Sequence, residues 1–160
     1  MLVSEFFLIV AFFVNLGLGF LVFFKSQAHR NVNIIFSALA WACAGWGFCL
    51  LMIYLGVPTT LLWGRLSFTT SGIIPLSFLL FTLFFPKKQV IINPLRIILL
   101  SLLTILFFGF SFTDKIVFSL GFGQKMFNYG VLYPFFSIYL MGYLLLGFAF
   151  LIISYKRGVG

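Results

Sequence analysis

The feature that most constrains the fold is a series of long apolar runs separated by short links. Each run is long enough to cross a bilayer as an α-helix, which takes about 20 residues. Hydrophobic residues make up 63% of the chain and charged residues 8%, whereas about a quarter of the residues of a soluble domain are charged. The sequence therefore predicts an all-α membrane protein, a bundle of about five transmembrane helices in one integral membrane domain, residues 1–160. The predicted helices are residues 4–24, 34–55, 63–85, 95–112 and 132–155.

Lysine and arginine are shared unequally between the two ends of this predicted bundle. One end carries Lys25, Arg30, Lys87, Lys88, Arg96, Lys156 and Arg157. The other end holds Lys115, Lys125 and the boundary residue Arg65. Because cytoplasmic loops carry the excess of positive charge, we expect an outside N-terminus and a cytoplasmic C-terminus in the inner (plasma) membrane. The net charge of +8 then reflects topology and headgroup contacts, and we expect no nucleic acid as a partner.

The third predicted helix contains the polar residues that most suggest a binding site. Its Pro75 cannot donate to the carbonyl of Ser71, so the helix must bend there or find another donor, with Gly72 adding flexibility. In lipid, a freed carbonyl must be satisfied by neighbouring groups or water, which suggests a small polar cavity. A packed proline kink is the more ordinary alternative. The candidate ligand-binding residues are Arg65, Thr69, Thr70, Ser71 and, from the first helix, Asn15.

Asn15 shares one face of the first helix with Ala11 and Gly19, because the three recur every four residues. Small residues on one face allow close helix packing, and an asparagine there can form a hydrogen bond across the contact. A packing face is therefore the first interpretation, and ligand contact the second.

Arg65 needs a partner, because a cation inside the membrane is costly unless it is paired or reaches the headgroups. The chain has two acidic residues, and the predicted topology places both at the same end as Arg65. We expect Arg65 to pair with Glu5, slightly preferred, or with Asp114, which would make Glu5 a structural residue. Contact with lipid phosphate is the alternative. The link of residues 113–130, with two short apolar stretches around a Gly-Phe-Gly turn, predicts a hairpin or an interfacial segment.

Three pieces of sequence carry a resemblance to a known family. They are RNVNIIFSALAWACAGWGF, WGRLSFTTSGIIPLSFLLFTLFFP and NYGVLYPFFSIYL, the last leading to a closing Lys-Arg pair. In this order they resemble the N-terminal seven-helix membrane region of bacterial sensor histidine kinases. The resemblance implies an input module joined to cytoplasmic signalling domains. The chain departs from the pattern in having about five predicted helices rather than seven, and no phosphoacceptor or ATP-binding domain.

The function expected from these observations is a membrane-embedded sensory module that passes a signal to a cytoplasmic partner domain not present in this chain. The sequence has no glycine-rich phosphate loop, no paired carboxylates and no Cys/His cluster, so we expect no catalysis, no metal and no cofactor. The bilayer is the expected partner, and a signalling domain or kinase and a second copy of the chain are candidates. The alternative function is a small transport or accessory subunit that works with partner chains; an inverted repeat would favour it.

Overall fold

The computed structural model describes residues 2–25, 30–57, 59–84, 94–120 and 127–158. Within these ranges the protein is all-helical except for one two-stranded hairpin, as predicted. The elements in chain order are α1 (Leu2–Phe23), α2 (Arg30–Tyr54), α3 (Thr60–Phe84), α4 (Pro94–Ser111), β1 (Val117–Leu120), β2 (Phe127–Tyr129) and α5 (Tyr133–Gly158).

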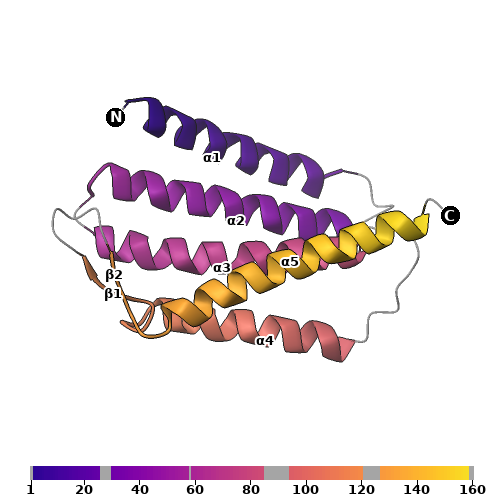
Figure 1. Cartoon of the computed structure of the whole chain (residues 1–160). Helices are drawn as coiled ribbons and strands as arrows, with labels where there is room; N and C mark the ends of the chain where they lie inside the picture. The colour runs from indigo at the N-terminus through magenta and orange to yellow at the C-terminus, as the bar shows by residue number, and fades with distance from the viewer. Residues whose placement is uncertain (1, 26–29, 58, 85–93, 121–126, 159–160) are drawn as a thin grey trace.

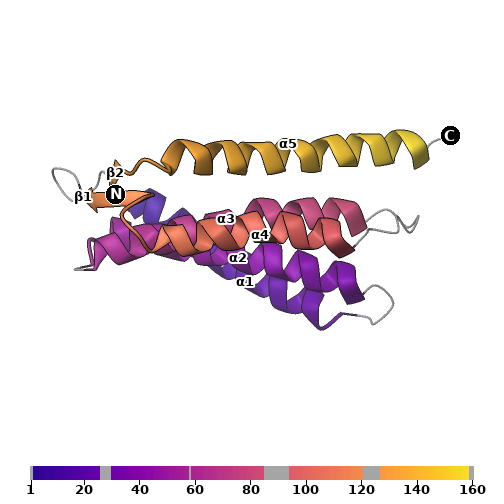
Figure 2. The same cartoon turned by 90° about the horizontal axis from the view of Figure 1, so that it is seen from below.

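The first four helices lie side by side in one row, each antiparallel to the next (Figure 1). α5 lies on one side of this row and crosses α3, so that α3 has neighbours on three sides: α2, α4 and α5 (Figure 2). The N-terminus lies at the hairpin end of the bundle and the C-terminus at the opposite end (Figure 1). This arrangement fits a chain that crosses the bundle an odd number of times.

Four helices are long and apolar enough to cross a membrane: α1, α2, α3 and α5. The fifth, α4, has a shorter apolar part, Ile97–Ser111. With 18 residues in all, α4 is about 27 Å long, slightly less than the hydrocarbon thickness of about 30 Å. The chain is therefore a multi-pass membrane protein with four clear spans and one shorter helix beside them.

The first two helices of the row are built differently. α1 packs on α2 and exposes apolar side chains in several directions, among them Phe7, Phe13 and Leu21, as a lipid-facing helix does. α2 meets its neighbours through small side chains, which allow close approach of helix backbones. Its buried residues are Ser37, Ala40, Ala42, Ala44, Gly47, Cys49 and Leu51.

The apolar core lies among α3, α4, α5 and the segment before and within β1, away from α1 and α2. Its buried members are Leu79, Phe107, Ile116, Val117, Phe136, Tyr139 and Tyr143. Four of these seven side chains are aromatic. Large rings thus fill the space between α5 and the row of helices, which Figure 2 shows as separate layers.

The predicted hairpin is confirmed: β1 and β2 pair antiparallel between α4 and α5, with an irregularity between Val117 and Ser119. Its return to α5 depends on Gly130, whose N–H donates to the carbonyl of Ile116 at 2.9 Å. A side chain at Gly130 would collide with the backbone carbonyls of Asp114 and Lys115. Only glycine lets the two segments approach this closely.

Candidate functional site

Arg65, in the second turn of α3, holds the hairpin end of the chain against the bundle. Its Nη2 forms an ion pair with Oδ1 of Asp114 and lies 3.5 Å from the carbonyl oxygen of Val117, to which it donates. Its Nη1 donates to the carbonyl of Phe112 at 3.1 Å. We call these four residues the hairpin clamp. The clamp joins α3 to three positions of the chain between the end of α4 and β1.

The predicted preference of Arg65 for Glu5 is wrong, because the partner is Asp114. Glu5 lies in the first turn of α1, and α2 separates α1 from α3 in the row. Asp114 follows α4, which is a direct neighbour of α3. The predicted topology brought both carboxylates to the same end of the bundle, but it did not say which helices are neighbours.

The hydroxyl groups of Thr69, Thr70 and Ser71 bond within their own helix, and that of Thr70 also forms a hydrogen bond with the Cys49 thiol of α2. Each donates to a carbonyl three or four residues earlier in α3, at 3.0 to 3.1 Å. Such bonds satisfy a hydroxyl inside the bilayer without a partner on another helix. These bonds favour a packed proline kink over a small polar cavity in α3. The ligand-binding roles of these three residues stay predictions.

Asn15 also bonds within its helix, donating from Nδ2 to the carbonyl of Ala11 at 2.8 Å. Gly19, one turn further along the same face, does contact α2: its carbonyl accepts the Ser37 hydroxyl at 2.9 Å, and the Trp41 ring lies on it. Packing through this face of α1 is therefore observed at Gly19. A ligand role for Asn15 remains a prediction.

The buried Pro75 lies inside α3 without ending the helix. A hydroxyl group from α5 bonds to the α3 backbone three residues before this proline. The Tyr139 hydroxyl donates to the carbonyl of Gly72 at 2.7 Å. Because a phenol has a single proton, its oxygen must accept the hydrogen bond from Thr104 of α4, also at 2.7 Å. We call Gly72, Thr104 and Tyr139 the tyrosine junction. It ties three helices together at one buried point beside the proline.

A second bond supports the same contact between α5 and α4. The Tyr143 hydroxyl, one turn after Tyr139, donates to the carbonyl of Leu100 at 3.0 Å. Both tyrosines thus place an aromatic ring in the core and a hydroxyl on a backbone or side-chain partner of another helix.

A series of aromatic rings links the hairpin to the tyrosine junction. The rings of Tyr129 in β2 and Tyr133 at the start of α5 stack with centroids 4.0 Å apart. Phe68 of α3 contacts both and also Phe136 of α5. The contact then passes through Phe107 of α4 to Tyr139. We call this series the aromatic column: Tyr129, Tyr133, Phe68, Phe136, Phe107 and Tyr139.

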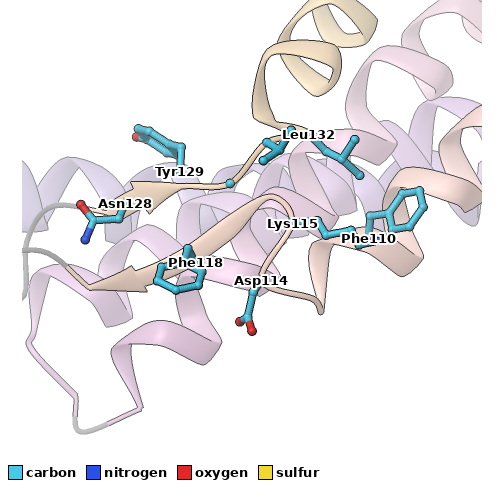
Figure 3. A pocket seen from close by; sticks show the side chains of 9 residues that line it. Phe110, Asp114, Lys115, Phe118, Asn128, Tyr129 and Leu132 are labelled. Atoms are coloured by element: carbon cyan, nitrogen blue, oxygen red, sulfur yellow. The ribbon is translucent and has the colours of Figure 1, made fainter.

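A groove of about 640 Å³ is lined by the end of α4, the hairpin and the segment that leads into α5 (Figure 3). Its walls are mostly apolar, and Asp114 and Lys115 bring charge to it. The Lys115 ammonium lies 5.3 Å from the centroid of the Phe110 ring, a cation–π distance. The lining residues are Phe110, Asp114, Lys115, Phe118, Asn128, Tyr129, Gly130, Val131 and Leu132.

The site thus combines a charged clamp, an aromatic column and a groove at one end of a membrane bundle. The model of the family described as the N-terminal 7TM region of histidine kinase matches residues 7–160. The chain belongs to this family. Comparison with curated proteins and with solved structures gives no match.

The match to the histidine kinase 7TM family confirms the resemblance found in the sequence, and this family is the N-terminal membrane region of histidine kinases, not their catalytic domain. The described ranges contain five helices, where the family description names seven. They also contain no group of three or more His, Cys, Asp or Glu side chains placed to hold a metal ion.

Sequence reasoning missed the tyrosine junction in this member of the family. Tyr139 and Tyr143 lie four residues apart in an apolar helix, so both hydroxyls face one side of α5. A hydroxyl in the membrane interior needs a hydrogen-bond partner, and that requirement was the available signal. Thr104 gave a weaker signal, because a threonine in a helix commonly bonds to its own backbone.

Proposed function

We propose that the chain is a sensory input module in which a change at the hairpin is passed through α5 to a cytoplasmic partner domain or kinase. The observation that carries the proposal is the continuous contact from the hairpin clamp, through the aromatic column, to the tyrosine junction. The clamp joins the column where Val117 pairs with Tyr129 in the hairpin. Membership of the histidine kinase 7TM family supports the same function.

α5 is suited to carry the change. Its first residue, Tyr133, follows β2 after only three residues, so a movement of the hairpin pulls directly on the start of the helix. Among the described ranges α5 is the longest helix, with 26 residues or about 39 Å, and its C-terminal end projects past the neighbouring helices in both views (Figures 1 and 2). A partner domain attached there would receive rotation or translation of α5 as its input.

In this proposal the hairpin faces the outside, the end of α5 faces the cytoplasm, and the chain sits in the inner membrane. The excess of Lys and Arg at the end that carries Lys156 supports this orientation. A second copy of the chain is a further proposed partner. The transport alternative needs a polar pathway, and the α3 hydroxyls that would line one bond to α3 itself.

The experiment joins a histidine kinase core after Lys156 as a continuous helix, with zero to four inserted alanines. Each insertion rotates the kinase by about 100° relative to α5. We expect autophosphorylation to vary with the number of alanines. In the fusion with the highest autophosphorylation, Arg65→Glu should change its level. The matched control Phe24→Ala, exposed beyond the end of α1, should leave it unchanged. A kinase level independent of both insertion length and Arg65 would contradict the proposal.

A further inference from the structure

The groove beside the hairpin contains a cation that the chain itself does not neutralise. The sequence has two acidic residues. Asp114 also lines the groove, but its carboxylate is paired with Arg65 of α3, so that Lys115 leaves one excess positive charge there. Glu5 lies on α1 at the far edge of the row. The Lys115 ammonium lies over the Phe110 ring. This cation–π contact holds the ammonium in position but does not neutralise its charge. The groove therefore favours a ligand with a negative charge.

The backbone fixes this lysine in place. The carbonyl of Lys115 accepts the N–H of Leu132 at 2.9 Å, and the carbonyl of the next residue, Ile116, accepts the N–H of Gly130. The Lys115 N–H lies 3.4 Å from the Thr113 hydroxyl, to which it donates. Since the segments on both sides of the groove are joined by these bonds, the groove is formed before any ligand binds.

The rest of the groove wall favours an apolar chain. Phe118 is 61% exposed and Val131 is 84% exposed, and both line the groove. Two apolar side chains this exposed would be unfavourable in water. They follow α4 and precede α5, and the ends of helices that cross a bilayer lie near its headgroups. A ligand that matches both the cation and this wall has an anionic head and an apolar tail.

We propose that this groove binds one anionic phospholipid, with its phosphate on the Lys115 ammonium and the first part of an acyl chain against Phe118 and Val131. The groove lies at the C-terminal end of α4 and the N-terminal end of α5, and lipid phosphates lie near the ends of helices that cross a bilayer. The inference concerns lipid binding alone and is independent of whether the chain signals.

The test is native mass spectrometry of the full chain released from nanodiscs that contain equal amounts of phosphatidylglycerol and phosphatidylcholine. We expect retained lipid to be mainly phosphatidylglycerol. Lys115→Gln should lower retained phosphatidylglycerol about fivefold, the factor that one lysine near a membrane surface supplies. Lys156→Gln is the matched control, an exposed lysine at the far end of α5. Equal retention in the two variants, or no preference between the two lipids in the wild type, would overturn the proposal.

A second arm separates a bound lipid from a bound free anion and locates it. Phosphatidylglycerol with a photoreactive group near the top of its acyl chain should label the groove wall, at or beside Phe118 and Val131. Excess glycerol phosphate, the headgroup without acyl chains, should not prevent labelling. Labelling spread evenly along α5, or its loss with glycerol phosphate alone, would show that the groove selects no lipid. Val131→Ser changes an exposed side chain, so it should leave the fold intact and weaken labelling while Lys115 remains.

Discussion

The two halves of the bundle are held together by different means. In the half made of α3, α4, α5 and the hairpin, large aromatic side chains fill the core and polar bonds join residues far apart in the chain. In the half made of α1 and α2, small side chains allow close packing beside ring contacts such as Phe12–Phe48 and Phe20–Trp41, and most of α1 faces outward. Under the proposed function, the half with a connected path from the hairpin to α5 carries the movement. The half made of α1 and α2 supports it.

Reversing the clamp charge should have the largest effect. Arg65→Glu places a carboxylate beside Asp114 and removes the donors to the carbonyls of Phe112 and Val117. We expect a loss of about 2 to 3 kcal/mol in the free energy of unfolding, since hydrogen bonds from a charged group contribute that much. The measurement is labelling of Cys43 and Cys49, half-buried and buried in α2, by a thiol dye on heating in detergent.

The same variant can be partly rescued, which distinguishes the two acidic residues. Adding Asp114→Arg to Arg65→Glu should recover part of the lost stability, because an ion pair forms again with reversed charges. Adding Glu5→Arg should recover none. Rescue by Glu5→Arg instead would mean that α1, not the hairpin segment, provides the partner of Arg65.

Loss of one hydroxyl from the tyrosine junction should have the next largest effect. Tyr139→Phe keeps the ring but leaves the Gly72 carbonyl and the Thr104 hydroxyl without this partner. We expect a loss of about 1 to 2 kcal/mol, at the upper end of the values for hydrogen bonds between membrane helices. Tyr143→Phe, which removes a single bond to the Leu100 carbonyl, is the matched control and should lose less. If the two variants unfold at the same temperature, the junction has no special role.

The smallest effect is expected in the other half of the bundle, at the contact between α1 and α2. Ser37→Ala removes the buried hydroxyl that donates to the Gly19 carbonyl. We expect a loss of about 0.6 kcal/mol, the average for such bonds in a membrane protein. Thermal unfolding of Ser37→Ala and Tyr139→Phe under the same conditions measures the two losses of stability. A loss larger than that of Tyr139→Phe would reverse the ranking of the two halves.

The sequence predicts the elements well and the contacts between them unevenly. The helices and the hairpin follow from apolar length and turn residues, which are local properties. The clamp was half predictable: only two carboxylates exist, but the choice between Glu5 and Asp114 depends on the order of helices in the row. The tyrosine junction was not predicted, because Tyr139 bonds to residues 67 and 35 positions away. The packing that brings them together involves rings from three helices.

The central claim is that a change at the hairpin reaches the end of α5 through the aromatic half. The most direct test measures the distance between spin labels at Tyr155→Cys, on α5, and Phe24→Cys, after α1, in nanodiscs. Both sites are exposed, and Cys43 and Cys49 are replaced by alanine in this background. We predict that Arg65→Glu shifts or broadens the distance distribution, that Tyr139→Phe added to it changes the shift, and that Ser37→Ala alone leaves the distribution unchanged. A second label, at Phe118→Cys, shows whether Arg65→Glu releases the hairpin. If the hairpin is released and the distance between residues 24 and 155 is unchanged, the account is contradicted.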